Sequence, residues 1–406
     1  MSDEETRGRS RVTEIYVNGL AEVTPDVPVG FEELERAALD AMDEKALGYV
    51  KGSAGGERTA ANNEAAFDRW RIEPEMLKGV ESRDLSVEAF GTEFDVPVML
   101  APIGCQSIVH EDGELASARA AAAQDVPMCL STVSSYAMEE VADELGDTPR
   151  WFQFYWSPDR DLAASFLDRA EDAGYEAVVV TVDTPLVGWR PRDLENAYLP
   201  YLEGVGIANY TSDDAFVDRL DHAPEENTLA TAQAFLDTFG DASLTWDDLD
   251  WLHDNTDLPV VVKGILSAAD ARRALEHGAD GVVVSNHGGR QVDGSVAALE
   301  ALPRVVDEVG DEAFVGFDSG VRRGADALKA LALGADLVLL GRPYVYGLAL
   351  EGPRASRPSS RTSSRTSTSR SAWRATTRWR ASTATRSPTS PSSRKVCRAL
   401  TSLNKD

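Results

Sequence analysis

The chain has few cysteines and no long hydrophobic run. Its 406 residues include three cysteines, Cys105, Cys129 and Cys397, whose spacing matches neither a disulfide framework nor a metal site. No apolar run is long enough to cross a bilayer, and the charged residues 1–10 lack the apolar core of a signal peptide. We therefore expect a cytoplasmic protein without a metal ion and without a membrane partner.

Basic residues are scarce beside acidic ones. The chain holds 40 Lys and Arg against 68 Asp and Glu, a formal net charge of -28 at pH 7. This balance argues against nucleic acid as a partner, because phosphate backbones are also negative. Acidic pairs such as Glu139-Glu140 fall in segments that look solvent-facing. Since concentrated salt screens such self-repulsion, a halophilic source is a hypothesis.

Short apolar runs alternate with amphipathic segments along the chain. Eight runs have the length and composition of buried strands, namely residues 97–101, 127–131, 151–155, 177–182, 258–263, 281–285, 313–317 and 337–341. Eight strands alternating with helices predict an α/β fold, a (β/α)8 TIM barrel. No GxGxxG turn follows an early strand, which weakens the alternative of a dinucleotide-binding open sheet.

The barrel is predicted to occupy residues 91–352. Residues 1–90 precede it and are expected to form a helical extension that closes the bottom of the barrel or flanks its site. The segment 186–257 is too long for a simple connection, so we expect an elaborated loop that covers the site.

The tail, residues 353–406, is rich in Arg, Ser and Thr, and after Glu351 no acidic residue occurs until Asp406. A disordered basic tail is one interpretation. A shift of reading frame is the one we favour, because reversing a one-base shift restores an amphipathic pattern in which Ser356, Ser359 and Ser360 become aliphatic. The chain as written is then expected to lack the helix that should follow the eighth strand.

Residues 285–290, with the sequence SNHGGR, follow a predicted strand and place His287 three residues before Arg290. A base beside an anion-binding guanidinium suits removal of a proton from a carboxylate-bearing substrate. A surface loop with an incidental histidine is the alternative. Other polar residues also fall at the ends of predicted strands, where a barrel builds its active site: Gly104, Ser131, Gln153, Tyr155, Thr181, Asp183, Lys263, Ser285, Asp318 and Arg342.

Seven motifs carry a specific resemblance. They are LAPIG at 100–104, FQFYW at 152–156, TVDTP at 181–185, VKG at 262–264, SNHGGRQ at 285–291, DSGVRRG at 318–324 and GRP at 341–343. From about residue 49 to residue 346, the chain resembles the FMN-dependent 2-hydroxy acid oxidases and dehydrogenases. Residues 155–160, 188–193 and 209–213 look most like the lactate 2-monooxygenase branch.

The resemblance implies roles for the substrate-binding residues. His287 matches the family's catalytic base, and Asp183 matches the carboxylate that orients it; a buried structural pair is the alternative. Arg190 and Arg290 match two arginines that hold the substrate carboxylate. Two tyrosines match family members' hydrogen-bonding groups, Tyr49 near the carboxylate and Tyr155 near the 2-hydroxyl; either could instead be core packing.

The resemblance also implies an FMN site. Lys263 matches the lysine near the flavin ring, with Ser285 beside it. The ring edge is expected to meet Ser131, Gln153 and Thr181, and its face the main chain of Pro102, Ile103 and Gly104. The phosphate is expected at the loops after the seventh and eighth strands, from Asp318, Ser319, Gly320, Arg322, Gly341 and Arg342. The family usually has glycine where this chain has Ser319; a glycine turn with surface arginines is the alternative.

The function implied is oxidation of a small L-2-hydroxy acid, lactate first, with oxygen or an electron carrier as acceptor, in a homo-oligomer. Gly104 stands where most oxidases of the family have alanine. The smaller residue is expected to leave room near the flavin, which suggests the monooxygenase outcome, in which the keto acid is decarboxylated before release. A close backbone approach without effect on the fate of the product is the alternative. Alternatives are a dehydrogenase with a non-oxygen acceptor, an FMN-binding remnant that is catalytically impaired, or another FMN barrel such as a type 2 isopentenyl diphosphate isomerase. Paired arginines beside a histidine base count against the last.

Overall fold

A computed structural model describes residues 7–78 and 84–355 of the chain. Eight parallel strands close into a barrel in the order β10-β3-β4-β5-β6-β7-β8-β9, which confirms the predicted TIM barrel. The strands are β3 (Val98–Leu100), β4 (Met128–Ser131), β5 (Arg150–Phe154), β6 (Val178–Thr181), β7 (Val260–Ile265), β8 (Gly281–Val284), β9 (Phe314–Phe317) and β10 (Leu337–Leu340). Each lies within two residues of a predicted run.

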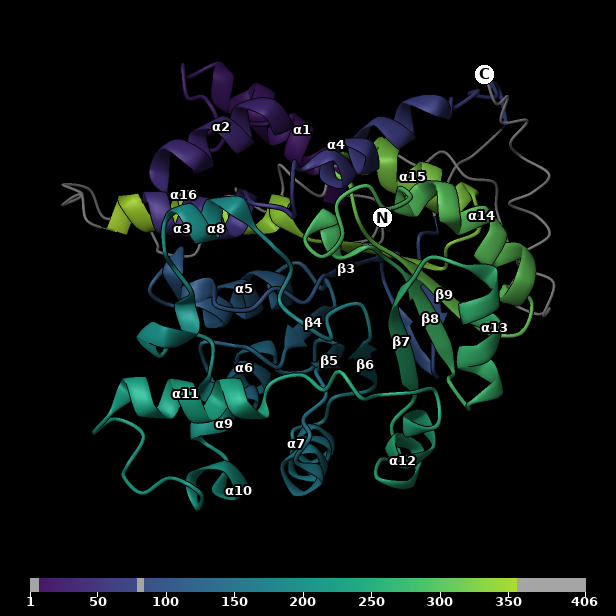
Figure 1. The fold of residues 1–406 in the computed structure, drawn as a ribbon. Helices are drawn as coiled ribbons and strands as arrows, with labels where there is room; N and C mark the ends of the chain where they lie inside the picture. The colour runs from purple at the N-terminus through teal and green to yellow at the C-terminus, as the bar shows by residue number, and fades with distance from the viewer. Residues whose placement is uncertain (1–6, 79–83, 356–406) are drawn as a thin grey trace.

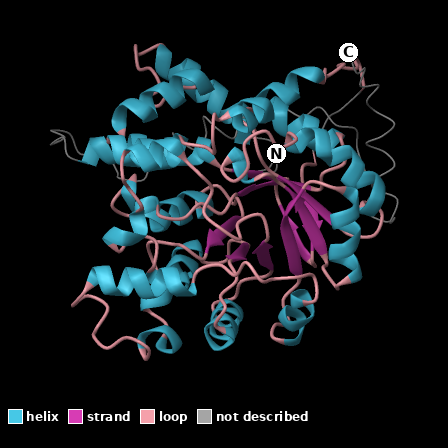
Figure 2. Cartoon of the chain, in the orientation of Figure 1, coloured by secondary structure: helices cyan, strands magenta, loops and turns pink. Residues whose placement is uncertain are grey.

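Helices surround the strands on the outside of the barrel (Figure 1; Figure 2). Their amphipathic sequences bury alanine and leucine against the sheet, as expected for the outer ring of such a barrel. In chain order after each strand they are α5 (Gly113–Ala122), α6 (Met138–Leu145), α7 (Arg160–Asp172), α12 (Asp248–Asp254), α13 (Ala268–Glu276), α14 (Ala298–Val309), α15 (Gly324–Ala332) and α16 (Arg342–Ala355).

An antiparallel hairpin of β1 (Val87–Ala89) and β2 (Thr92–Phe94) packs against an interior cluster of the barrel. Phe90 contacts the rings of Trp151 and Phe314, and Phe94 also contacts Trp151. Trp151 and Phe314 lie at the amino-terminal ends of β5 and β9, so the hairpin covers the bottom of the barrel. Of the two placements expected for the N-terminal helices, the bottom of the barrel is covered by these two short strands instead, which leaves the helices to flank the site.

The N-terminal helices lie near the opposite end, above the carboxyl ends of the strands. They are α1 (Arg7–Gly19), α2 (Phe31–Ala41), α3 (Glu44–Lys51), α4 (Arg58–Ala65) and the short 3-10 helix η2 (Ala66–Arg69). The amide groups of Asn63 and Asn286 hydrogen-bond each other reciprocally at 2.8 Å, joining α4 to the loop after β8. This contact fixes part of the extension beside the site.

Short helices fill the segment between β6 and β7. They are α8 (Pro191–Glu195), the 3-10 helix η4 (Pro200–Glu203), α9 (Ala208–Thr211), α10 (Asp214–Val217) and α11 (Thr228–Thr238), followed by α12. Aromatic contacts anchor them on the barrel: Phe239 packs on Tyr155 with ring centroids 5.1 Å apart, and Tyr210 packs edge-on against Phe166 at 4.9 Å.

A helix does follow the eighth strand. Helix α16 begins at Arg342, directly after β10, and the rings of Tyr344 and Tyr346 are buried. The sequence before residue 353 therefore supplies most of a helix that we expected the tail to provide. Residues 356–406, where most of the proposed frame change falls, lie outside the described residues. Within the described part of the chain, no helix is both long and apolar enough to cross a membrane.

Candidate active site

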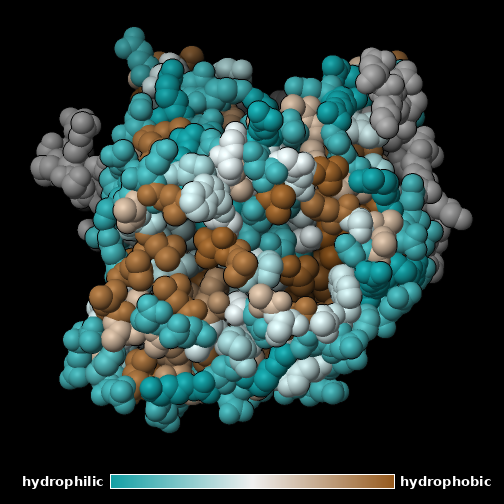
Figure 3. Space-filling model, viewed as in Figure 1, coloured by the Kyte–Doolittle hydropathy of each residue, from teal (hydrophilic) through white to brown (hydrophobic). Residues whose placement is uncertain are grey.

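A pocket opens at the carboxyl ends of the barrel strands. Apolar residues gather in the middle of the face that Figure 3 shows, around a hollow, while hydrophilic residues occupy much of the edge. The pocket draws its lining from segments between Tyr49 and Arg342, including α3, most of the strand ends and the segment after β6. Sixteen of the residues expected at the site line it: Tyr49, Pro102, Ile103, Gly104, Ser131, Tyr155, Arg190, Lys263, His287, Arg290, Asp318, Ser319, Gly320, Arg322, Gly341 and Arg342.

Four further expected residues, Gln153, Thr181, Asp183 and Ser285, lie just behind this lining. Gln153 accepts a hydrogen bond from Ser131, and Thr181 is the register partner of Lys263. The other two contact His287 and Lys263, as described below. The structure therefore brings all the expected residues to one end of the barrel.

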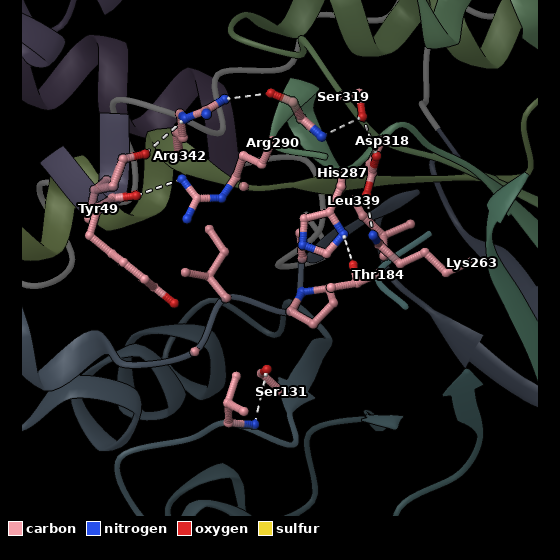
Figure 4. A pocket seen from close by; sticks show the side chains of 18 of the residues that line it. Tyr49, Ser131, Thr184, Lys263, His287, Arg290, Asp318, Ser319, Leu339 and Arg342 are labelled. Carbon is pink, nitrogen blue, oxygen red and sulfur yellow. Dashed lines mark hydrogen bonds and ion pairs between the residues drawn. The ribbon is translucent and has the colours of Figure 1, made fainter. Parts of the chain in front are cut away.

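His287 lies in the pocket between Arg290 and Lys263 (Figure 4), and it forms a hydrogen-bonded pair with Asp183 behind the lining. The imidazole Nδ1 lies 2.8 Å from Asp183 Oδ1, and the Thr184 hydroxyl donates to the same carboxylate oxygen at 2.9 Å. Burial opposes ionisation of Asp183, but the charges of His287 and Lys263 prevail and hold its pKa at about 2. Burial lowers the pKa of His287, which Asp183 counteracts and Lys263 reinforces. A neutral imidazole then donates Nδ1–H to an ionised Asp183 and keeps the Nε2 lone pair for a substrate proton.

The loop that carries His287 has an unusual backbone. His287 has a φ of 57°, and the next two residues, Gly288 and Gly289, also have positive φ. A Cβ on Gly289 would lie 2.6 Å from the backbone nitrogen of Ala60, so helix α4 can approach this closely only because no side chain is present. The two glycines thus let the loop turn sharply under α4.

Three arginines lie close together on one side of the pocket, and most of their hydrogen-bond acceptors are neutral. Arg290 donates to the carbonyls of Tyr49 and Gly52 at 2.6 and 2.7 Å, at the end of α3. Arg342 donates to the Gly52 carbonyl as well, and Arg190 donates to the Arg290 carbonyl. Burial and the charges of Arg190 and Arg342 lower the pKa of Arg290 to about 9. Local positive charge in a strongly acidic chain is what a bound anion would relieve.

Lys263 lies on the other side of His287. Its Nζ is 3.5 Å from Asp318 Oδ2 and donates to the Ser285 hydroxyl at 3.3 Å. Burial alone would lower the pKa of Lys263, but Asp318 and Asp183 raise it above the usual value. This buried ammonium group therefore stays charged and can stabilise negative charge that develops in front of it.

Several buried polar atoms near the barrel top have no hydrogen-bond partner within the described residues. They include Gln153 Nε2 and Thr181 Oγ1, at the ends of β5 and β6, and Arg322 Nε after β9. Buried polar groups are rarely left unpaired in a native protein. These atoms lie where a polar ligand above the barrel could meet them.

Both expected tyrosines border the pocket and are buried. The Tyr49 hydroxyl donates to Cys105 Sγ at 3.7 Å, and the Arg290 guanidinium stacks over the Tyr49 ring at 5.1 Å. Burial raises the pKa values of Tyr49 and Tyr155, so both remain hydroxyl donors. The position of each fits contact with a small ligand between them.

Sequence reasoning missed several lining residues. Thr184 adjoins Asp183 in the TVDTP motif and could have been found there. Leu199, Tyr201 and Phe239 come from the segment after β6, where no strand end marks a side chain for the site. They form an apolar and aromatic wall that the order of motifs does not reveal.

The argument that Gly104 leaves room in the site was wrong. A Cβ at this position would lie 2.2 Å from the carbonyl oxygen of Val133 and 2.6 Å from its Cγ2. The same carbonyl accepts a hydrogen bond from Cys105 N at 2.9 Å. The space that glycine leaves is therefore filled by the backbone after β4 and is not open to a ligand.

These features define a TIM-barrel enzyme site with a histidine–aspartate pair beside a buried group of arginines. The model of the FMN-dependent dehydrogenase family matches residues 38–357. An L-lactate oxidase of Lysinibacillus sphaericus is 44% identical over 325 residues, which cover 80% of this chain and 83% of that protein. An FMN-dependent alpha-hydroxy acid dehydrogenase of Schizosaccharomyces pombe is 43% identical over 349 residues, with 84% and 86% covered.

The crystal structure of a mandelate oxidase superposes with a TM-score of 0.71 at 39% identity and covers 82% of this chain and 90% of the other. The chain therefore belongs to the FMN-dependent dehydrogenase family of 2-hydroxy acid oxidoreductases. FMN is the cofactor of this family.

The residues present fit FMN. The unpaired Gln153 Nε2 and Thr181 Oγ1, together with charged Lys263, supply the donors, acceptor and cation that a polar ring edge needs. The unpaired Arg322 Nε and the Arg342 guanidinium lie beside the glycine-containing loops after β9 and β10, which suits a phosphate. Gly320 has a φ of 93°, and a Cβ there would lie 2.6 Å from the Asn63 carbonyl oxygen.

Proposed function

We propose that the chain oxidises a small L-2-hydroxy acid, L-lactate first, to the 2-keto acid with FMN as cofactor. The observation that carries the proposal is the His287–Asp183 pair directly beside the crowded arginines of one pocket. A base next to an anion-binding group is what removal of hydrogen from a carbon beside a carboxylate requires.

His287 is the base in this proposal. Its Nδ1–H is held by Asp183 at 2.8 Å, so Nε2 accepts the proton from the substrate hydroxyl or from the α carbon. Ionised Asp183 then stabilises the imidazolium that forms. When bound, FMN supplies the acceptor for the remaining two electrons.

The substrate carboxylate is proposed to bind Arg190, Arg290 and the Tyr49 hydroxyl. The planar guanidinium matches a carboxylate through two parallel hydrogen bonds, which an ammonium group cannot make. Arg290 is held in place by carbonyls at the end of α3, and Arg190 by the Gln291 side chain at 2.9 Å. Tyr155 is proposed to contact the 2-hydroxyl group.

The flavin ring and the phosphate of the cofactor are proposed to bind at different ends of the pocket. Lys263 and Ser285, with Ser131, Gln153 and Thr181, are proposed to hold the ring edge, and the main chain of Pro102, Ile103 and Gly104 its face. The phosphate is proposed to bind the backbone of Asp318, Ser319, Gly320 and Gly341 and the side chains of Arg322 and Arg342. Gly341 leaves an open approach, since a Cβ there would meet only Ile103 Cδ1, at 3.7 Å.

The apolar wall favours a substrate with a small apolar side chain. Leu199, Tyr201 and Phe239 line the pocket without a charged group among them, and an apolar group gains more than a polar one from such a surface. Lactate carries a methyl group at this position. The L-lactate oxidase of Lysinibacillus sphaericus, similar along most of its length, supports lactate as the first candidate.

Product fate and electron acceptor are separate proposals. Oxygen is proposed as acceptor, with release of the keto acid or of its decarboxylated product as in lactate 2-monooxygenases; a dehydrogenase with a carrier as acceptor is the alternative. Gly104 gives less support to the monooxygenase outcome than its size suggested, because Val133 fills the space beside it. A catalytically impaired FMN-binding remnant is the second alternative.

We also propose that residues 353–406 arise from a shift of reading frame. The family match ends at residue 357, close to the point where acidic residues disappear. The expected protein is a cytoplasmic homo-oligomer. Sequencing the gene tests the frame, and a clean frame through codon 353 would contradict it.

Anaerobic reduction tests the function. The chain, with its frame restored after Gly352, is loaded with FMN and mixed with L-lactate while the flavin absorbance is followed. Bleaching is the expected result, and admitting oxygen while acetate and pyruvate are assayed separates the two product fates. Arg290→Lys keeps the charge but loses the paired hydrogen bonds, so KM should rise about 10- to 100-fold. Bound FMN that no 2-hydroxy acid bleaches would point to the remnant.

A further inference from the structure

Three successive backbone N–H groups around His287 are held by two serine hydroxyls. Asn286 N and Gly288 N donate to Ser319 Oγ at 3.3 and 3.0 Å, and His287 N donates to Ser285 Oγ at 3.0 Å. Serine hydroxyls thus accept hydrogen bonds from the backbone amide of His287 and from the amides of the residues on both sides of it. Two of these three contacts depend on one side chain, that of Ser319.

These hydrogen bonds hold a strained segment of the backbone. His287 has a φ of 57°, a left-handed conformation in which the Cβ of an L-residue approaches the following carbonyl. Such a conformation is unfavourable for a residue with a side chain and persists only where surrounding contacts hold it. The hydrogen bonds to Ser319 and Ser285 are contacts of that kind.

Ser319 uses its whole hydrogen-bonding capacity here. It donates its one proton to Asp318 Oδ1 at 2.6 Å and accepts two N–H groups. Asp318 in turn pairs with Lys263, 3.5 Å away. Ser319 therefore links the buried Lys263–Asp318 ion pair to the loop of His287 (Figure 4).

Ser319 is an unusual residue for its own backbone. Its φ is 79°, a conformation that glycine adopts without strain. The side chain is buried, so it makes these contacts away from bulk solvent. A serine in a glycine conformation is explained if the hydroxyl does something that glycine cannot do.

We propose that the Ser319 hydroxyl is a positioning group. It fixes the backbone of the His287 loop and so holds the imidazole against Asp183, at a fixed position relative to Lys263. This role is separate from any contact between the Ser319 backbone and the cofactor phosphate. The proposal rests on the proposed function only in treating His287 as the base.

Ser319→Gly tests the proposal, because it removes the hydroxyl while easing the backbone strain. Ser157→Ala is the matched control: Ser157 is also buried, and its hydroxyl accepts from Asp159 N at 3.2 Å, away from the His287 loop. Exchange of the His287 Nδ1 proton with solvent is followed by NMR of histidine labelled with nitrogen-15. The rate of flavin reduction is measured at saturating FMN, and FMN affinity separately by fluorescence titration.

In Ser319→Gly we expect proton exchange at His287 at least about tenfold faster and flavin reduction about tenfold slower, with substrate KM and FMN affinity within about threefold of the parent; about tenfold corresponds to 1.4 kcal/mol. Ser157→Ala should change neither rate. Unchanged exchange and reduction, or a loss confined to FMN affinity, would overturn the positioning role. Faster exchange in a protein that no 2-hydroxy acid reduces would leave the positioning role standing and refute the proposed function.

Discussion

At the scale of single residues, His287 is the side chain on which the proposed chemistry depends most. It combines a strained backbone with a hydrogen bond to ionised Asp183. His287→Gln keeps a polar side chain but removes the base, so flavin reduction by lactate should slow by roughly 10²–10⁴-fold. Stopped-flow reduction measures the change, and FMN binding should be retained. A variant that reduces FMN at the parental rate would show that another group takes the proton.

The same residue sets the expected pH dependence. Burial and the charge of Lys263 lower the pKa of His287, against the opposing effect of Asp183. The neutral form, which is the active base, therefore persists to lower pH than for a free histidine. We expect kcat/KM for lactate to stay level as the pH falls to about 6.5 and to decline only below it. Asp183, with a pKa of about 2, stays ionised over this range. A decline that begins well above 6.5 would contradict this.

Gly104 is a packing requirement in this structure. Gly104→Ala would place a Cβ 2.2 Å from the Val133 carbonyl oxygen, so the loop after β3 or the backbone after β4 must move. We expect a loss of about 1–3 kcal/mol in the free energy of unfolding, as for overpacked cores. Gly19→Ala is the control, because nothing lies within 4 Å of a Cβ there. Denaturant titration compares the two. An equally small effect at both positions would mean that the loop yields easily.

At the scale of elements, the hairpin β1–β2 closes the end of the barrel away from the site. Phe94 is buried against Trp151, with ring centroids 5.9 Å apart. Phe94→Ala should lower the free energy of unfolding by about 3–5 kcal/mol, the usual cost of removing a buried ring. The KM for substrate should not change, since the pocket lies at the other end of the strands. A raised KM with unaltered stability would contradict this division between bottom and top.

The N-terminal helices contact the other end of the barrel, where the site lies. Carbonyls at the end of α3 hold Arg290 and Arg342, and Asn63 of α4 holds Asn286. A segment that precedes the barrel in sequence is therefore part of its active site. Contacts of more than 200 residues in sequence separation, such as Tyr49 with Arg290, have no local signal in the chain.

At the scale of the whole molecule, the chain carries a formal net charge of -28 at pH 7. Self-repulsion of such a charge is screened by salt, with a Debye length of about 10 Å at 0.1 M and about 3 Å at 1 M. We expect the midpoint of thermal unfolding to rise by several degrees between these concentrations. Calorimetry with KCl measures it, and flavin reduction should be retained at high salt. Full stability without added salt would contradict the halophilic hypothesis.

Much of the architecture could be read from the sequence. The eight strands are short, apolar and rich in valine, because both faces of a barrel strand are buried, and this leaves a clear pattern. Polar residues at their ends, such as Lys263 and His287, converge because parallel strands bring all their carboxyl ends to one rim. Strand positions, fold class and the polar residues at the strand ends were therefore readable from local patterns, whereas Tyr49 and Arg190 were expected only from the resemblance.

Only the tertiary structure decided the rest. Three contacts join elements that are distant in sequence. Val133 fills the space beside Gly104, Phe239 packs on Tyr155 in the aromatic wall, and the Ser319 hydroxyl accepts hydrogen bonds from the His287 loop. Periodicity reports which face of one element is buried, but not what it is buried against. Those pairings follow from close packing of the complete chain.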